Sequence, residues 1–153
     1  NFASLHRLPV LFLCEDNELA VHASKSERQS FSIEKLVESF GIPYLRIDNG
    51  FDPIEVFVKS KGIVDQIRKE QKPFFLHIKT RRYKEHVGPG EDFSAGYRSA
   101  EDMNLWKASD PLFSFRENNP EIVENLNREI ASAIDFANSS SVAAPKDLLT
   151  DVI

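Results

Sequence analysis

The sequence predicts an α/β domain, in which a parallel sheet is flanked by helices. The first observation is an unbroken apolar run, Val10 to Cys14 with Leu8 just before it, which stops at the polar residues 15–18. Such a run is typical of a strand buried on both faces, as in parallel sheets. The second observation is that strand-like and helix-like segments alternate up to residue 80, which indicates βαβ units.

The segments between residues 22 and 50 follow that alternation. A polar loop is expected over His22–Phe31. Ser32 can cap a helix that Gly41 ends, and its apolar stripe is Ile33, Leu36, Val37 and Phe40. A short strand is expected over Tyr44–Asp48, before the turn signal Asn49-Gly50.

The next helix and strand have equally clear boundaries. Asp52 is a natural N-cap, and Pro53 suits the first helical position. We expect this helix to be disturbed near Gly62 and to turn its apolar residues inward: Ile54, Phe57, Val58, Val64 and Ile67. Phe74–Ile78 is the third predicted strand.

The order changes after Thr80. A long charged loop spans Arg81–Arg98, and loops of this length inside a domain are usually functional or disordered. Ser99 opens a helix that Asp110-Pro111 breaks, and an amphipathic helix covers Glu121–Asn138. Its apolar stripe is Ile122, Leu126, Ile130, Ala133, Ile134 and Ala137. We therefore expect a domain over residues 1–138 and a tail over residues 139–153.

Composition narrows the class of protein. The chain has 153 residues, a hydrophobic fraction of 41% and a charged fraction of 28%, which suit one globular domain with a core. The net charge of −5 argues against general nucleic-acid binding. No apolar run is long enough to span a bilayer. The single Cys excludes an internal disulfide and indicates a reducing compartment.

Several common site types are absent from the sequence. There is no Cys-x-x-Cys pair for zinc, no Gly-x-Ser-x-Gly elbow and no glycine-rich phosphate loop. Cys14 lies inside an apolar run and is expected to be a buried spacer. Among the histidines, we expect His6 on the surface, His77 simply packed in a strand, and His22 outside any site although it follows the polar cluster.

Two places remain as candidates. Ligands in parallel α/β folds bind beyond the carboxyl ends of strands, so Asn17 is placed to offer an amide oxygen to Mg²⁺, with Asp16 and Glu18 as other oxygen donors. His86 lies in the long loop with Arg81 and Arg82, and these cations could grip a phosphate. The alternatives are an ordinary strand end and a solvated basic loop.

These residues, in this order, resemble the α subunit of the thiamine diphosphate-dependent E1 component of 2-oxo acid and acetoin dehydrogenases. The likeness runs from Asn1 to about Phe136. The family's cofactor motif begins with Gly-Asp-Gly and ends in Asn-Asn after a helix and a buried strand, and residues 1–17 are similar to its second half. Thr80-Arg-Arg-Tyr-Lys-Glu-His86 is similar to the family's Thr-x-Arg-x-x-x-His, and Gly96-Tyr-Arg98 and Ser109-Asp-Pro111 continue the match.

The resemblance implies a set of site residues. Asn17 falls on the residue that ligates Mg²⁺ through its side chain, and Leu19 on the one that ligates through its backbone carbonyl. Arg82 and His86 fall on residues that approach the cofactor, and His86 is the implied catalytic residue. Asp16 replaces the first Asn of the pair, and Val87 replaces the Ser that is phosphorylated in regulated members. The Gly-Asp-Gly half would precede Asn1, so we expect a piece of a longer protein.

The resemblance also implies a fold, a reaction and partners. The fold is the C-terminal half of a thiamine diphosphate-binding fold with further C-terminal helices. The reaction is decarboxylation of a 2-oxo acid (or cleavage of acetoin) with acyl transfer to a lipoyl group. Thiamine diphosphate and Mg²⁺ are the cofactors. The partners are a β subunit, in an α2β2 heterotetramer, and the lipoyl domain of E2, in the bacterial cytoplasm in preference to the mitochondrial matrix.

Two alternatives stay open at this point. One is a thiamine diphosphate carboligase of transketolase type, which acts without lipoyl. The other is a non-catalytic, truncated interaction module. In each case we expect the chain by itself to be inactive.

Overall fold

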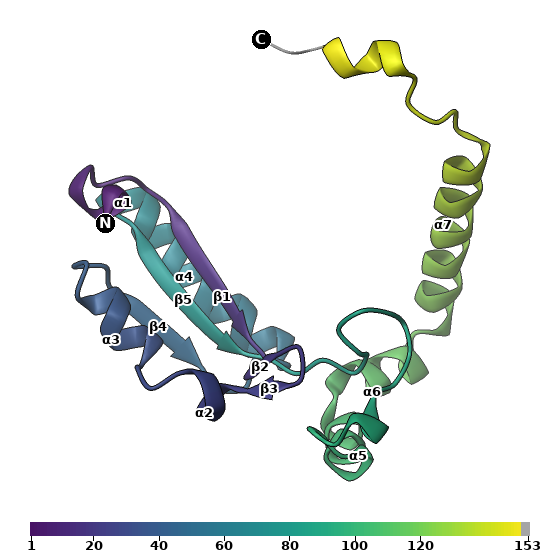
Figure 1. Cartoon of the computed structure of the whole chain (residues 1–153), viewed down its shortest axis with the longest axis horizontal. Coiled ribbons are helices and arrows are strands. Elements are labelled where there is room, and N and C mark those ends of the chain that lie inside the picture. Colours follow the sequence, from purple (N-terminus) through teal and green to yellow (C-terminus); the bar gives the residue numbers. More distant parts are fainter. Residues whose placement is uncertain (151–153) are drawn as a thin grey trace. The chain divides into compact units, whose positions relative to one another are not determined.

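A computed structural model describes residues 1–150, and it has the predicted α/β architecture (Figure 1). The main sheet has three parallel strands in the order β1 (Leu11–Asp16), β5 (Phe74–Lys79) and β4 (Tyr44–Ile47). The three strands predicted from the sequence are therefore confirmed, and β5 lies at the centre. Their carboxyl ends meet at one edge of the sheet, where Asp16 and Lys79 are register partners.

Helix α4 (Pro53–Glu70) covers one face of the sheet and builds the core with it. The Asp52 carboxylate accepts hydrogen bonds from the backbone N–H groups of Ile54 and Glu55, as its N-cap position predicts. The core cluster consists of Ile47, Ile63, Ile67, Phe74, Leu76 and Ile78. Helix α3 (Ile33–Glu38), capped by Ser32 as expected, reaches the opposite face through the contact between Glu34 and His77.

Some expectations for this part of the chain were wrong. The predicted polar loop over residues 22–31 contains β3 (Ala23–Ser24), which pairs with β2 (Leu19–Ala20), and α2 (Lys25–Arg28). A local device explains α2: Glu27 accepts hydrogen bonds from the backbone N–H and the hydroxyl of Ser24, a capping box that starts a helical turn. The chain begins with a short helix, α1 (Phe2–Leu5).

The predicted burial was wrong for β1 and only partly right for α4. Strand β1 is not buried on both faces, since Phe12 is 40% and Leu13 54% exposed. In α4, Ile67 is buried as predicted, together with Ile63, and Val64 is half-buried, whereas Ile54, Phe57 and Val58 are exposed. The helix runs without interruption through Gly62. Cys14 is half-buried, and this burial raises the pKa of its thiol.

After β5, the loop leads through a short 3-10 turn, η1 (Phe93–Ala95), to α5 (Ala100–Ser109). Ser99 caps α5 as predicted, since its hydroxyl oxygen accepts a hydrogen bond from the Asp102 N–H at 3.1 Å. A further helix, α6 (Pro111–Asn118), starts at the predicted break.

The chain divides into two compact units, Asn1–Pro111 and Leu112–Ile153. The second contains α7 (Pro120–Ser139), the predicted amphipathic helix, and η2 (Pro145–Leu149). Its apolar stripe is largely exposed, with Ile122 at 39% and Ile130 at 57%. Within residues 1–150, no helix combines the length and the apolar character needed to cross a bilayer. The division into residues 1–138 and 139–153 stays a prediction.

Candidate functional site

A hollow of about 270 Å³ lies at the carboxyl ends of β1 and β5. It is lined by all four residues for which the sequence predicts cofactor contacts: Asn17, Leu19, Arg82 and His86. The first two follow β1 and the last two follow β5, so parallel pairing of these strands brings together residues that are more than 60 positions apart. The remaining lining residues are Ala20, Val21, Lys84, Tyr97 and Arg98.

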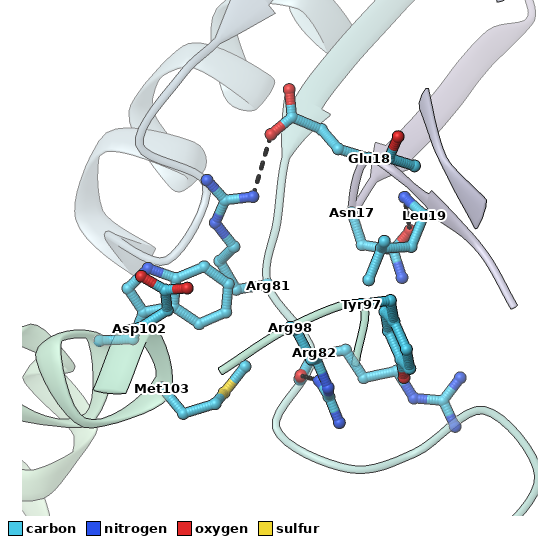
Figure 2. A pocket seen from close by; sticks show the side chains of 11 residues that line it. Asn17, Glu18, Leu19, Arg81, Arg82, Tyr97, Arg98, Asp102 and Met103 are labelled. Carbon is cyan, nitrogen blue, oxygen red and sulfur yellow. Dashed lines mark hydrogen bonds and ion pairs between the residues drawn. The ribbon is translucent and has the colours of Figure 1, made fainter. Parts of the chain in front are cut away.

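The turn after β1 fixes the position of Asn17. Its Oδ1 accepts a hydrogen bond from the Leu19 N–H at 3.2 Å, which forms an Asx-type turn. The residue between them, Glu18, has a positive φ of 63°, and its N–H donates to Asp16 Oδ1 at 2.9 Å. Figure 2 shows Asn17 and Leu19 together above Tyr97 on the wall of the adjoining cavity.

The loop after β5 presents its cations through a set of internal hydrogen bonds. Arg82 Nη2 donates to the backbone carbonyl of His86 at 3.2 Å, and Arg98 Nη1 donates to the carbonyl of Arg82 at 2.6 Å. Arg98 is in turn paired with the buried carboxylate of Asp92, which also accepts the Tyr97 hydroxyl. The loop therefore brings positive charge to the hollow from several side chains, and His86 remains exposed within it.

An adjoining cavity of about 390 Å³ shares five lining residues with the first: Asn17, Leu19, Arg82, Tyr97 and Arg98 (Figure 2). Trp106 and Met103 of α5 line this cavity, and the Arg81 guanidinium lies 4.4 Å from the centre of the Trp106 ring. Glu18, which the sequence offered as an oxygen donor for a metal, is instead paired with Lys79 and Arg81 at 3.0 Å each.

Several residues near the site were missed or undervalued from the sequence. Tyr97 and Arg98 line both cavities, yet in the sequence they only continued the resemblance. His22, expected outside any site, stacks on Tyr97 with ring centroids 4.8 Å apart. The stacking of His22 on Tyr97 and the hydrogen bond from Arg98 to the Arg82 carbonyl link segments that are apart in the sequence, so no local pattern signals them.

Asp16 was considered as an oxygen donor and as an added charge beside the site, but its carboxylate is engaged elsewhere. It is 8% exposed and is bound by Lys25 and His77. Burial would raise the pKa of Asp16, but hydrogen bonds from Lys25, the Glu18 N–H and His77 outweigh it and lower that pKa to about 2. The expectation that His77 only packs was wrong, because both of its ring nitrogens contact carboxylates.

The donor set of the hollow suits a magnesium diphosphate. An Asn amide oxygen and a backbone carbonyl are hard ligands of the kind Mg²⁺ prefers, and Mg²⁺ commonly takes further ligands from a bound phosphate. Arg and His side chains are suitable donors to the phosphate oxygens. Residues 1–150 contain no group of three or more His, Cys, Asp or Glu side chains that could hold a metal by itself. The described residues thus offer part of a coordination shell.

Fold and site together define an α/β domain with a cationic, oxygen-lined hollow at the carboxyl edge of a parallel sheet. A family model described as "Dehydrogenase E1 component" matches residues 1–146. The chain belongs to this family.

Curated relatives fit this assignment. The chain is 30% identical to the pyruvate dehydrogenase E1 component subunit alpha of Rickettsia bellii, over 99% of this chain and 49% of the relative. It is 29% identical to the 2-oxoisovalerate dehydrogenase subunit alpha of Bacillus subtilis, over 97% of this chain and 48% of that relative. It is also 30% identical to the pyruvate dehydrogenase E1 component subunit alpha of Zymomonas mobilis, over 100% of this chain and 46% of that relative. The chain spans about half the length of the curated relatives it matches.

Proposed function

We propose that this chain forms part of the α subunit of a 2-oxo acid dehydrogenase E1 component and that its hollow binds the diphosphate and Mg²⁺ of thiamine diphosphate. The observation that carries the proposal is the convergence of Asn17, Leu19, Arg82 and His86 on one hollow. Two turns that are distant in sequence supply the metal ligands and the phosphate-binding cations, respectively. If the two short motifs matched the family by chance, nothing would require their residues to meet in one hollow.

Each residue has a specific role in this proposal. The amide oxygen of Asn17 and the carbonyl oxygen of Leu19 would hold Mg²⁺ against the diphosphate. Arg82 binds the phosphate oxygens with its guanidinium. His86 donates a hydrogen bond from its imidazole to the diphosphate and can move a proton at the reacting centre. When bound, thiamine diphosphate supplies the electron sink for cleavage beside the substrate's keto group.

The substrate class and partners follow from the family. The relatives act on pyruvate and on 2-oxoisovalerate by name, so we propose a 2-oxo acid as the substrate. The proposed partners are a β subunit, in an α2β2 heterotetramer, and the lipoyl domain of E2, which receives the acyl group. The proposed location is the bacterial cytoplasm.

The test is cofactor binding by the full-length protein that contains this chain, assembled with its β subunit. We expect Asn17→Ala to weaken the affinity for thiamine diphosphate in the presence of Mg²⁺ by about tenfold or more, because loss of a residue that merely orients a metal ligand commonly costs that much. We expect His86→Ala to lower turnover or cofactor affinity. The matched controls are Asn104→Ala, at an exposed position of α5, and His6→Ala, an exposed histidine beside α1. Both controls should behave as wild type.

The outcomes separate the alternatives. An unchanged cofactor affinity in Asn17→Ala would show that Asn17 is not a metal ligand. Wild-type turnover and affinity in His86→Ala would show that the His86 loop is an ordinary solvated surface. Reduction of lipoyl groups by the assembly supports a dehydrogenase, whereas acyloin formation without lipoyl reduction indicates a carboligase. Failure to bind the cofactor at all would favour a non-catalytic interaction module.

A further inference from the structure

A buried polar array links three elements directly behind the proposed metal-binding turn. Its centre is His77 of β5, which is 1% exposed and lies on the opposite face of the sheet from the core residues Leu76 and Ile78. His77 Nε2 lies 2.9 Å from Asp16 Oδ2 on β1, and Nδ1 lies 2.7 Å from Glu34 Oε1 on α3. A buried ring with a carboxylate at each nitrogen differs from a histidine that fills core volume.

The two carboxylates beside the ring have further partners. Asp16 accepts from Lys25 and from the Glu18 N–H, and Glu34 accepts from the Ser32 hydroxyl at 2.6 Å and from Arg46 Nη1 at 3.3 Å. Both carboxylates therefore act as acceptors, as ionised carboxylates must. The ring lies between them, with one of its nitrogens within hydrogen-bond distance of each. Lys25 and Arg46 complete the charges around the array.

The array connects to the site through the two oxygens of one side chain. Oδ2 of Asp16 is held by His77 and Lys25, while Oδ1 holds the Glu18 N–H and so bridges across Asn17. The next N–H along the chain, that of Leu19, is held by Asn17 itself. If Asp16 rotates, the bridge across Asn17 opens. His77 and Lys25 are thus the two side chains that hold the Asp16 carboxylate from the side opposite the turn.

We propose that His77 is a positioning residue for the metal-binding turn: held between Asp16 and Glu34, it fixes the Asp16 carboxylate that helps to hold Asn17 and Leu19 in place. This inference rests on the proposed function, because it concerns the same site. Residues behind metal ligands that orient them are commonly worth 10- to 100-fold in metal affinity. Sequence alone did not distinguish His77 from a packed residue.

The test measures the affinity of the full-length αβ assembly for thiamine diphosphate and for Mg²⁺ by calorimetry, with thermal unfolding alongside. His77→Gln should weaken both affinities by about tenfold. The matched control is Ile63→Val, a buried core substitution on α4 away from the array. It should lower the melting temperature and change the affinities by less than about twofold, since it creates a small core void without touching the turn.

A double-mutant cycle tests whether His77 acts through Asp16. In an Asp16→Asn background, His77→Gln should weaken binding by less than about threefold, because the contact between His77 and the Asp16 carboxylate is already lost. Equal effects of His77→Gln in both backgrounds would overturn the proposal, as would an affinity loss no larger than that of Ile63→Val. If His77→Gln does not assemble, Glu34→Ala replaces it: it removes the acceptor at Nδ1, and unchanged affinities would overturn the proposal.

The controls also separate this inference from the proposed function. If wild type binds the cofactor and Asn17→Ala does not, the proposed function stands whatever His77→Gln shows. If the wild-type assembly itself does not bind the cofactor, the proposed function is wrong, and the inference about His77, which rests on it, is overturned with it.

Discussion

Strands β1 and β5 have similar apolar sequences and very different surroundings. Leu13 of β1 and Leu76 of β5 are register partners on neighbouring parallel strands, so their side chains point to the same face of the sheet. Leu76 is 1% exposed, while Leu13 is 54% exposed. The reason is position: Leu76 lies between Leu13 and Leu45, whereas β1 is an edge strand of the sheet as described. An apolar sequence therefore shows that a strand has side chains suited to burial, and the elements packed beside the strand decide which of these side chains are buried.

The largest expected effect comes from truncating these two partners. Leu76→Ala should lower the free energy of unfolding of this chain by about 2–5 kcal/mol, because it opens a cavity in a packed core. Leu13→Ala should cost less than about 1 kcal/mol, because its side chain already meets solvent. Urea unfolding of the two variants measures the difference. Equal losses would show that β1 is covered in solution, and the contrast between the strands would then disappear.

The second prediction concerns the carboxyl ends of the same strands, where Asp16 of β1 is as buried as the core. Hydrogen bonds hold the pKa of Asp16 at about 2, below its ordinary 3.8, against the opposing effect of burial. Burial likewise opposes the lowering for Glu34, but hydrogen bonds from Ser32, its own backbone N–H and His77 bring its pKa from 4.5 to about 2. A lowered folded-state pKa stabilises the protein above the unfolded value, and this contribution is lost as pH falls through the folded value.

Unfolding free energy should therefore fall between about pH 4.5 and pH 2, by on the order of 2 kcal/mol for each carboxylate. Urea unfolding across this range measures the loss. Asp16→Asn should flatten the acid dependence, and Glu121→Gln, at an exposed position of α7, is the control that should not. A profile that is as steep in Asp16→Asn as in wild type would show that Asp16 is not the group that titrates.

The smallest expected effect concerns the residues that cap the starts of helices α4 and α7. Asp52 accepts hydrogen bonds from two backbone N–H groups of α4, whereas Asn119 makes no side-chain cap hydrogen bond at the start of α7. Asp52→Ala should lower the free energy of unfolding by about 1 kcal/mol, and Asn119→Ala by a few tenths or less. Chemical denaturation followed by circular dichroism compares them. A larger loss in Asn119→Ala would mean that α7 is capped differently in solution.

Local sequence signals were most informative where one short segment decides the outcome. Ser32, Asp52 and Ser99 start helices as predicted, and Gly41 adopts the positive φ of 70° that suits the end of α3. The capping box at Ser24 and Glu27 was equally local and could have been recognised in the sequence, but it was missed because the surrounding residues are polar.

Non-local features were predicted less well. Of the residues predicted to face inward in α4, Ile67 is buried, but Ile54, Phe57 and Val58 are exposed. The position of the sheet decides which part of an apolar helix is covered, and here it covers the C-terminal half. His77 was read as packing, since neither Asp16 nor Glu34 lies near it in sequence. The ion pair between Lys25 of α2 and Asp16 of β1 also joins two separate elements, so the sequence does not signal it.

The sequence by itself determined the α/β class, the three parallel strands and the amphipathic α7, because strand periodicity and helix caps are local properties of the chain. The resemblance of its motifs to the E1 family predicted Asn17, Leu19, Arg82 and His86 as site residues. Only the tertiary structure decided that β5 is central and β1 an edge, that the four site residues share one hollow, and that His77 joins two carboxylates behind it. Those features depend on the packing of segments distant in sequence, and packing fixes burial and charge pairing.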